Sequence, residues 1–373
     1  MDNPFSSIFR SFSGNKDTSV IGLDVGSSSV KVVQIKKKSG KAVLETYGEI
    51  ALGPYAGTDI GRSTILSAEK LAGAIKDLLK ESNTTTQNSC MSISIGSSFV
   101  VFFKIPITDE KQFAEMIPIE ARKYIPVSIS EVTLDWLVIP RDEDTLSEFQ
   151  GGQQKVPSDP GTDILLVVIH NDALNKNKEI QKITGLDISF SEVEIFSSIR
   201  ASLEPSLNPQ MIIDFGASTT KVFMVERGIL KASHVINRGS QDITISISKS
   251  LNITFDEAEK LKRLQGISEN NTQTNVTDVT SVTIDYILSE VSRIIISYER
   301  KYLKKINRVV LTGGGSLLKG LKDKTQNSLN TPVEIADPFS KIEYPAFLDE
   351  VLRNAGPEFA VAIGLAIRKL QEA

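Results

Sequence analysis

The stretch LDVGSSSVKVV, residues 23–33, decides the fold because a second copy of it follows as IDFGASTTKVF, residues 213–223. Aligned on the aspartates, both copies carry Asp, Gly, Ser, Lys and Val at matching positions. Each copy predicts a buried apolar strand that ends on an aspartate, then a turn of glycine and small hydroxyl residues, then a return strand. The chain is therefore expected to contain two related β-hairpins, one in each half.

Such turns are suited to polyphosphates. Glycine and serine let backbone N–H groups approach an anion closely, and the hydroxyl groups add donors. Asp24 and Asp214 cannot bind a phosphate directly, since like charges repel, but they can hold the hydrated cation that a polyphosphate carries. One copy alone is also an ordinary tight turn. Two copies that face each other would hold one nucleotide from both sides.

A third apolar strand runs into glycine at VVLTGGGS, residues 309–316. Three strand-to-glycine elements in this order resemble the phosphate-1, phosphate-2 and adenosine motifs of the actin/Hsp70/sugar-kinase ATPase superfamily. Sugar kinases would need a catalytic aspartate and a larger sugar domain, and Hsp70 a long domain after the third motif. Neither is expected in these 373 residues.

More specific stretches resemble the PilM family of type IV pilus assembly proteins, from about Val20 to Leu370. They are IEARKYIP (119–126), EVTLDW (131–136), FDEAEKLK (255–262), GGGSLL (313–318), DPFSK (337–341) and FAVAIGLA (359–366). The alternative is the related cell-division family FtsA or a filament-forming ATPase. FtsA proteins carry a C-terminal linker and an amphipathic membrane helix, and this sequence ends shortly after its last core-like helix, which favours PilM.

The resemblance implies an α/β fold of the actin-like ATPase type, with duplicated RNase H-like domains and an inserted strand–helix–strand subdomain of the 1C type. The expected parts are the first domain (19–97 and 187–204), the inserted subdomain (98–186), the second domain (205–252 and 281–345), its 2B subdomain (253–280), and a C-terminal helix (346–373) that returns to the first domain.

The resemblance also assigns the nucleotide site, with ATP and Mg²⁺ as ligands. Asp24 and Asp214 would orient the metal through water, and Lys31 would reach the β- or γ-phosphate. The phosphates would lie on two turns, and the ribose or base on a helix and a third turn. These residues are Gly26, Ser27 and Ser28; Gly216, Ala217 and Ser218; Glu259 and Lys262; and Gly313, Gly314 and Ser316.

Three positions qualify this assignment. Glu194 matches the place where actin-like proteins orient the attacking water, but Ala217 stands where actin has an acidic residue, so weak ATP hydrolysis at most is expected. Lys221 is left out of the site, because superfamily members mostly use only the first lysine. From spacing alone, Glu259 and Lys262 could equally form a solvated i,i+3 pair.

Composition narrows the partners. The net charge of −4 and the absence of a long basic block argue against nucleic acid. The sequence contains no run of 18 apolar residues, so no membrane-spanning helix is expected. The single cysteine, Cys90, excludes an internal disulfide. Phe5, Ile8, Phe9 and Phe12 form one small apolar helical face that could dock on a partner, graze a membrane or pack on the chain itself.

The PilM resemblance places the protein in the cytoplasm, peripheral to the inner membrane. There it would hold the short cytoplasmic tail of a single-span, PilN-like pilus protein, which could add to an exposed strand edge of the inserted subdomain. Self-association is possible as well.

Several local expectations are open to test. Helices are expected at 68–80, 172–184, 282–303 and 357–370, the last with small residues for close backbone packing. Residues 243–251 fit a strand or a helix, and 267–280 a loop. A capping box at Thr254 opens a helix with Leu264 on its inner face. Thr108 or Asp109 caps a helix that Pro118 kinks or restarts, and 141–162 forms a loop.

Overall fold

The computed structural model describes residues 18–106, 110–139, 161–267 and 274–372. Two five-stranded sheets form the body of the molecule, in the orders β3-β2-β1-β4-β8 and β11-β10-β9-β12-β13. The first sheet consists of β1 (Ser19–Val25), β2 (Ser29–Lys38), β3 (Lys41–Ala51), β4 (Asn88–Ile93) and β8 (Asp187–Val193). The second consists of β9 (Gln210–Phe215), β10 (Thr220–Glu226), β11 (Ile229–Ile236), β12 (Arg308–Thr312) and β13 (Val333–Ile335).

The two sheets share one topology, which confirms the predicted duplication. In each sheet a three-strand meander is followed by two parallel strands. Asp24 lies opposite Lys31 in the first hairpin, and Asp214 lies opposite Lys221 in the second. The second turn of each meander consists of a non-glycine residue and a glycine, both with positive φ. These residues are Ser39–Gly40 between β2 and β3, and Arg227–Gly228 between β10 and β11.

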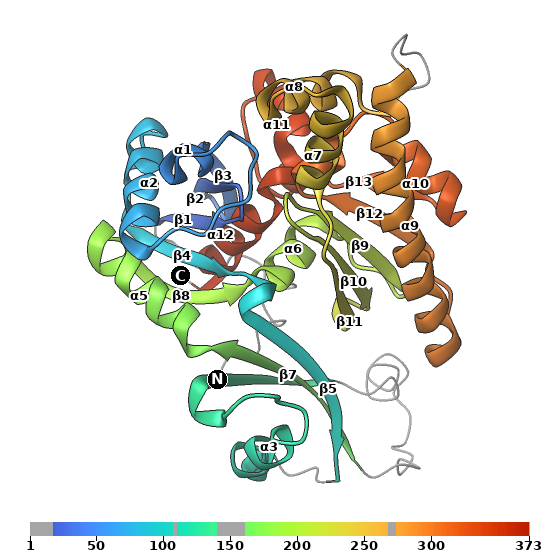
Figure 1. Cartoon of the computed structure of the whole chain (residues 1–373). Helices are drawn as coiled ribbons and strands as arrows, with labels where there is room; N and C mark the ends of the chain where they lie inside the picture. Colours follow the sequence, from blue (N-terminus) through green and yellow to red (C-terminus); the bar gives the residue numbers. More distant parts are fainter. Residues whose placement is uncertain (1–17, 107–109, 140–160, 268–273, 373) are drawn as a thin grey trace.

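Helices cover both faces of each sheet (Figure 1). The outer face of the first sheet packs against α2 (Ala68–Glu81) and α5 (Asn171–Thr184), and that of the second against α7 (Ser240–Leu251) and α9 (Thr274–Tyr302). Between the two sheets lie α6 (Glu194–Ser202) and α12 (Ala360–Glu372). Apolar side chains of α6 pack against strands of both sheets, and those of α12 pack against the first sheet and α6. The body also contains α1 (Gly53–Ala56), α8 (Phe255–Gln265), α10 (Leu321–Leu329) and α11 (Asp349–Ala355).

Small residues let α12 approach its neighbours at backbone distance, as its sequence predicts. A Cβ added to Gly22 of β1 would lie 2.0 Å from the Ala362 carbonyl oxygen. A Cβ added to Gly364 would lie 2.0 Å from the Ser197 carbonyl oxygen of α6. The helix therefore locks the first hairpin and α6 together, and it fixes the strand end that carries Asp24.

The inserted region forms a separate antiparallel sheet, ordered β5-β7-β6, below the body in Figure 1. One face packs against α3, and the other joins the apolar cluster around α6. Its elements are β5 (Ser98–Ile105), α3 (Phe113–Ala121), β6 (Val132–Ile139) and β7 (Thr162–His170). The next helix, α5, contributes Ile180 to the core of the first half beside α2. Ala173 and Leu174 of the same helix pack on the cluster that includes β7, so α5 contacts both the first half and the inserted sheet.

Of the two alternatives for residues 243–251, the structure has the helix, as part of α7. Three other local expectations differ from the structure. Residues 274–280 are the first turns of α9 rather than a loop. Leu264 is exposed rather than inward. Pro118 lies inside the single helix α3, which ends before Tyr124. Thr108, Asp109, the apolar face of residues 5–12 and most of the loop 141–162 lie outside the described residues. In the described part of the chain, no helix is long and apolar enough to cross a membrane.

Candidate nucleotide-binding cleft

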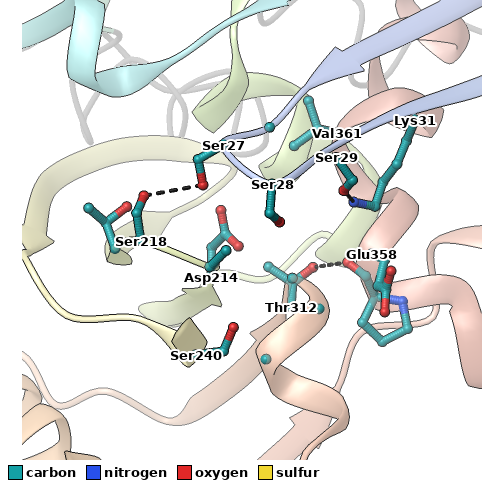
Figure 2. Close-up of a pocket in the computed structure, with 18 of the residues that line it drawn as sticks. Ser27, Ser28, Ser29, Lys31, Asp214, Ser218, Ser240, Thr312, Glu358 and Val361 are labelled. Carbon is teal, nitrogen blue, oxygen red and sulfur yellow. Dashed lines mark hydrogen bonds between the residues drawn. The ribbon is translucent and has the colours of Figure 1, made fainter. Parts of the chain in front are cut away.

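A cavity of about 390 Å³ lies between the two halves. Its walls are the turns that follow β1, β9 and β12, together with α7, α8 and the start of α6. Figure 2 shows Ser27 and Ser218 pointing at each other from the two hairpin turns, with Asp214 between them and the third turn. The structure thus brings the three glycine motifs of the sequence to one site.

The two hairpin turns have matching backbones. Gly26 N–H donates to the Ser29 carbonyl, and Gly216 N–H to the Thr219 carbonyl, both at 3.0 Å. The Ser218 hydroxyl lies 3.2 Å from that of Ser27, which links the halves across the cavity. Ser28 and Ala217 line the same space. Ala217 has no side-chain donor, but its carbonyl accepts from Gln241 N–H at 3.0 Å and ties the turn to α7.

In the first hairpin, the aspartate and the lysine do not pair with each other. Lys31 Nζ lies 2.7 Å from Ser29 Oγ and 2.9 Å from a Glu49 carboxylate oxygen. Asp24 is buried at the cavity floor, and burial raises its pKa to about 6, although the charges of Lys31 and Lys221 oppose this. The Asp24 carboxylate therefore lies in a desolvated position that a cation would stabilise.

The carboxyl groups of Glu49 and Glu358 both lie beside Lys31. Glu358 precedes α12, and both burial and the charge of Glu49 raise its pKa to about 7. Burial also acts to raise the pKa of Glu49, but Lys31 outweighs it and the pKa falls below its ordinary value. Near neutral pH the two acids thus share one ammonium group, and Glu358 is the one that holds a proton.

In the second hairpin, the lysine turns to its aspartate. Lys221 Nζ lies 3.1 Å from Asp214 Oδ2 and 2.6 Å from Glu194 Oε2. The other oxygen of Glu194 accepts from Ile95 N–H at 2.8 Å. Burial acts to lower the pKa of Lys221, but the charges of Asp214 and Glu194 outweigh it and raise the pKa. Lys221 therefore lines the cavity through this ion pair, although the sequence-based expectation leaves it out of the site.

Glu259 and Lys262 lie in the cavity wall, so the alternative of a solvated pair is wrong. Their exposed fractions are 7% and 6%, and Lys262 Nζ lies 2.6 Å from Glu259 Oε2 and 2.9 Å from Thr244 Oγ1. Burial lowers the pKa of Lys262 despite this partner. Arg263 binds the second Glu259 oxygen at 2.8 Å. The polar face of α8 thus points inward, and Leu264 points to solvent.

The third turn approaches the second hairpin closely. Gly313 has φ +78°, and a Cβ there would lie 2.3 Å from Asp214 Oδ1, so both the backbone conformation and the space require glycine. Gly314 lines the cavity beside Glu358. Ser316 does not line it. Its side chain is buried behind the turn and donates to the Gly313 carbonyl at 2.6 Å, so it shapes the turn.

Sequence reasoning missed Ser29, Glu49, Lys221, Arg263 and Glu358, which all line the cavity. Lys221 had a signal, since it repeats the position of Lys31. Glu49 lies opposite Lys31 in the β2–β3 register, but that register shifts between Gln34 and Ile35 and cannot be counted from the sequence. Glu358 lies in the short turn directly before α12, and no local sequence motif there indicates that it lines the cavity.

The donor set fits a magnesium ion held through water. Six acidic and four basic side chains line the cavity, and a polyphosphate would add further negative charge to it. They are Asp24, Glu49, Glu194, Asp214, Glu259 and Glu358, and Lys31, Lys221, Lys262 and Arg263. Among the described residues no three acidic, histidine or cysteine side chains are close enough to hold a metal directly. Magnesium commonly keeps several waters and binds through one or two carboxylates and phosphate oxygens.

Known proteins resemble this chain over nearly all its length. The chain is 26% identical over 365 residues to the cell division protein FtsA of Staphylococcus epidermidis, covering 85% of this chain and 74% of that protein. Among solved structures, the PilM-PilN type IV pilus biogenesis complex matches with a TM-score of 0.78 and 23% identity, over 95% of this chain and 99% of that one. MreB5 of Spiroplasma citri bound to AMPPNP matches with a TM-score of 0.51 and 14% identity, over 94% and 95%.

These structural likenesses confirm the predicted actin-like ATPase fold. The similarity to FtsA agrees with the predicted kinship of the two families, and the family model decides between them. The model described as type IV pilus assembly protein PilM matches residues 22–370. The chain therefore belongs to the PilM family of type IV pilus assembly proteins.

Proposed function

We propose that this protein binds ATP with Mg²⁺ in the cleft and acts as a nucleotide-gated scaffold at the cytoplasmic face of the inner membrane. The observation that carries the nucleotide proposal is the convergence of two matching hairpin turns and a third glycine turn on one cavity. The turns offer backbone N–H groups and the hydroxyls of Ser27, Ser28 and Ser218 to phosphates. The MreB5 structure of the same fold holds AMPPNP.

Within this proposal the residues divide the work. The two hairpin turns bind the phosphate chain from opposite sides, and Lys31 supplies a positive charge beside it. Asp24 and Asp214 hold the waters of the metal, which would offset the charge of the phosphates. Glu259 and Lys262 lie in the wall formed by α8, and Gly313 and Gly314 in the third turn, so these four would border the ribose and base.

Isothermal titration calorimetry with ATP and Mg²⁺ tests the assignment. Asp24→Ala and Asp214→Ala should each weaken binding at least about tenfold, which corresponds to about 1.4 kcal/mol. Asp323→Ala is the matched control, because Asp323 is an exposed aspartate on α10 outside the cavity. Wild-type affinity in both cleft variants, or no binding by the wild type, would show that this cavity is not an ATP site.

We propose that hydrolysis, where it occurs, is slow and depends on Glu194. Each Glu194 oxygen already accepts one hydrogen bond, from Lys221 or from Ile95 N–H, so loss of the Lys221 contact would free a further lone pair with which the carboxylate can orient water. Ala217 offers no second acid. Single-turnover phosphate release should fall in Glu194→Ala, and an unchanged rate would remove Glu194 from the reaction.

The proposed partner is the short cytoplasmic tail of a PilN-like membrane protein. The matched chain in the structure of the PilM-PilN complex has the same fold as this protein. In the inserted sheet β7 is central, so β5 and β6 are its edges, where an extended peptide could add main-chain hydrogen bonds. The tail would thereby hold the scaffold at the membrane.

Hydrogen exchange on the intact protein locates such docking. Adding the tail peptide should slow exchange in β5 or β6, and a scrambled peptide should not. Fluorescence anisotropy of the labelled peptide gives the affinity in parallel, with and without ATP. Binding with protection confined to other elements would show that the inserted sheet is not the docking surface.

A further inference from the structure

The ammonium group of Lys221 lies where three acidic side chains of the cleft meet. It contacts Asp214 and Glu194 directly, and its charge also acts on Asp24. The lysine side chain is 13% exposed, and the two carboxylates it contacts are 10% and 9% exposed. Lys221 is therefore a buried cation on the acids that the proposed function assigns to metal and water.

Lys31 shows that this placement is not a consequence of the hairpin alone. Each lysine lies opposite an aspartate in its own hairpin, and the two hairpins have the same register. Lys31 turns away from Asp24 toward Ser29 and Glu49, whereas Lys221 turns toward Asp214. The neighbour that makes the difference is Glu194, which begins α6 and lies within 2.6 Å of Lys221.

A cation bound to Asp214 competes with any other cation for the same oxygens. Hydrated magnesium held by Asp214 would bring two positive charges next to the ammonium group, and like charges repel strongly in a buried site. Lys221 has a flexible four-carbon stem, so it can turn to a phosphate oxygen when the carboxylates are taken. Its departure would leave Glu194 Oε2 without its partner and able to accept from water.

We propose that Lys221 is a resident cation that holds Asp214 and Glu194 before nucleotide binds and is displaced when magnesium arrives with the nucleotide. This rests on the proposed ATP site. Under this proposal, magnesium binding also breaks the contact between Lys221 and Glu194. We also expect wild-type protein to bind ATP without magnesium better than a variant that lacks this lysine.

Calorimetry with ATP, in Mg²⁺ and in EDTA, measures the competition as the ratio of the two dissociation constants. Lys221→Met keeps the length of the side chain and removes its charge, so the ratio of Kd in EDTA to Kd in Mg²⁺ should rise at least about tenfold. Lys31→Met is the matched variant. It should weaken binding in both conditions by similar factors, because Lys31 is proposed to bind phosphate, and its ammonium group contacts Ser29 and Glu49 rather than Asp24 or Asp214.

An unchanged ratio in a folded Lys221→Met protein, checked by circular dichroism, would overturn the proposal. If the wild type binds no ATP in either condition, the proposed function itself has failed, and the ratio cannot be formed. The two failures are thus distinguishable.

A measurement on the wild type covers the case in which Lys221→Met does not fold. In protein labelled with ¹⁵N-lysine, the buried Lys221 ammonium should give a slowly exchanging NMR signal, identified by its absence from the Lys221→Arg spectrum. ATP with Mg²⁺ should shift or remove this signal. A signal of Lys221 that is the same before and after saturation would show that the lysine is not displaced.

Discussion

The two hairpins share a sequence, a strand register and a turn, yet they differ in where their lysines go. Lys31 leaves its aspartate for Glu49 of β3, and Lys221 stays with its aspartate and adds Glu194 of α6. The repeated residues thus set the backbone, while carboxylates from neighbouring elements decide which ion pairs form. The first hairpin keeps Asp24 free of a direct lysine contact, and the second neutralises Asp214.

The strands before the two aspartates differ in a second way. Gly22 of β1 touches the backbone of α12, whereas the matching residue of β9 is Ile212, whose side chain packs in the apolar cluster around α6. One half is joined to its central helix by close backbone approach and the other by side-chain packing. Three substitution experiments, ordered by expected effect, test how far the halves differ.

The largest effect is expected from Gly22→Val. The added Cβ would lie 2.0 Å from the Ala362 carbonyl oxygen and 2.8 Å from the Ala366 nitrogen, and a helix backbone cannot move away as a side chain can. Stability to urea, followed by circular dichroism, should fall by about 3 kcal/mol or more. Ile212→Val in the other half should cost about 1 kcal/mol. Equal losses would contradict the proposed difference in packing.

The sequence was informative where a pattern depends on one segment alone. The hairpins, the glycine turns, the capped helix α8 and the small residues of α12 each follow from local spacing. The resemblance to a known superfamily supplied the fold, and the residues expected in the two phosphate turns all line the cavity. Glu358 and Glu49 could not be predicted, because they reach the cavity only through tertiary packing. The expectation that Leu264 faces inward was wrong for a related reason: α8 borders a polar cavity, so Lys262 is buried and Leu264 is exposed.

An intermediate effect, dependent on pH, is expected from Glu358→Gln in the first half. The pKa of Glu358 is about 7 in the folded protein, against an ordinary value of 4.5 for a glutamate. Between these values the folded state binds more protons than the unfolded state, so wild-type stability falls as pH rises. Glutamine cannot ionise. The variant should match the wild type near pH 4.5 and exceed it by about 1–3 kcal/mol above pH 7.

Urea unfolding at pH 5 and pH 8 measures this difference. Glu334→Gln is the control from the second sheet, because its carboxylate is exposed and lies outside the cavity. The control should shift stability little and by a similar amount at both pH values. A Glu358→Gln gain that is the same at pH 5 and pH 8 would mean that proton binding by Glu358 is not its cause.

The smallest effect is expected where the first half reaches across to the second. The Arg62 guanidinium lies 4.3 Å from the centre of the Phe255 ring on α8, and Ser63 N–H donates to Gln241 Oε1 of α7 at 3.0 Å. The segment between α1 and α2 thus joins the two halves beside Gly61, which lines the cavity and lies against Glu259. We expect nucleotide release to require that these contacts separate.

Arg62→Ala should therefore speed nucleotide release about two- to fivefold, since a cation–π contact at a partly exposed site contributes about 0.5–1 kcal/mol. Stopped-flow displacement of a fluorescent ATP analogue measures the rate. Arg353→Ala, an exposed arginine paired with Asp349 on α11, should leave it unchanged. Phe255→Leu removes the same contact from the other half, so the double variant should release nucleotide no faster than either single variant. If the two effects instead multiply, Arg62 and Phe255 act separately, and the halves are not held together at this point.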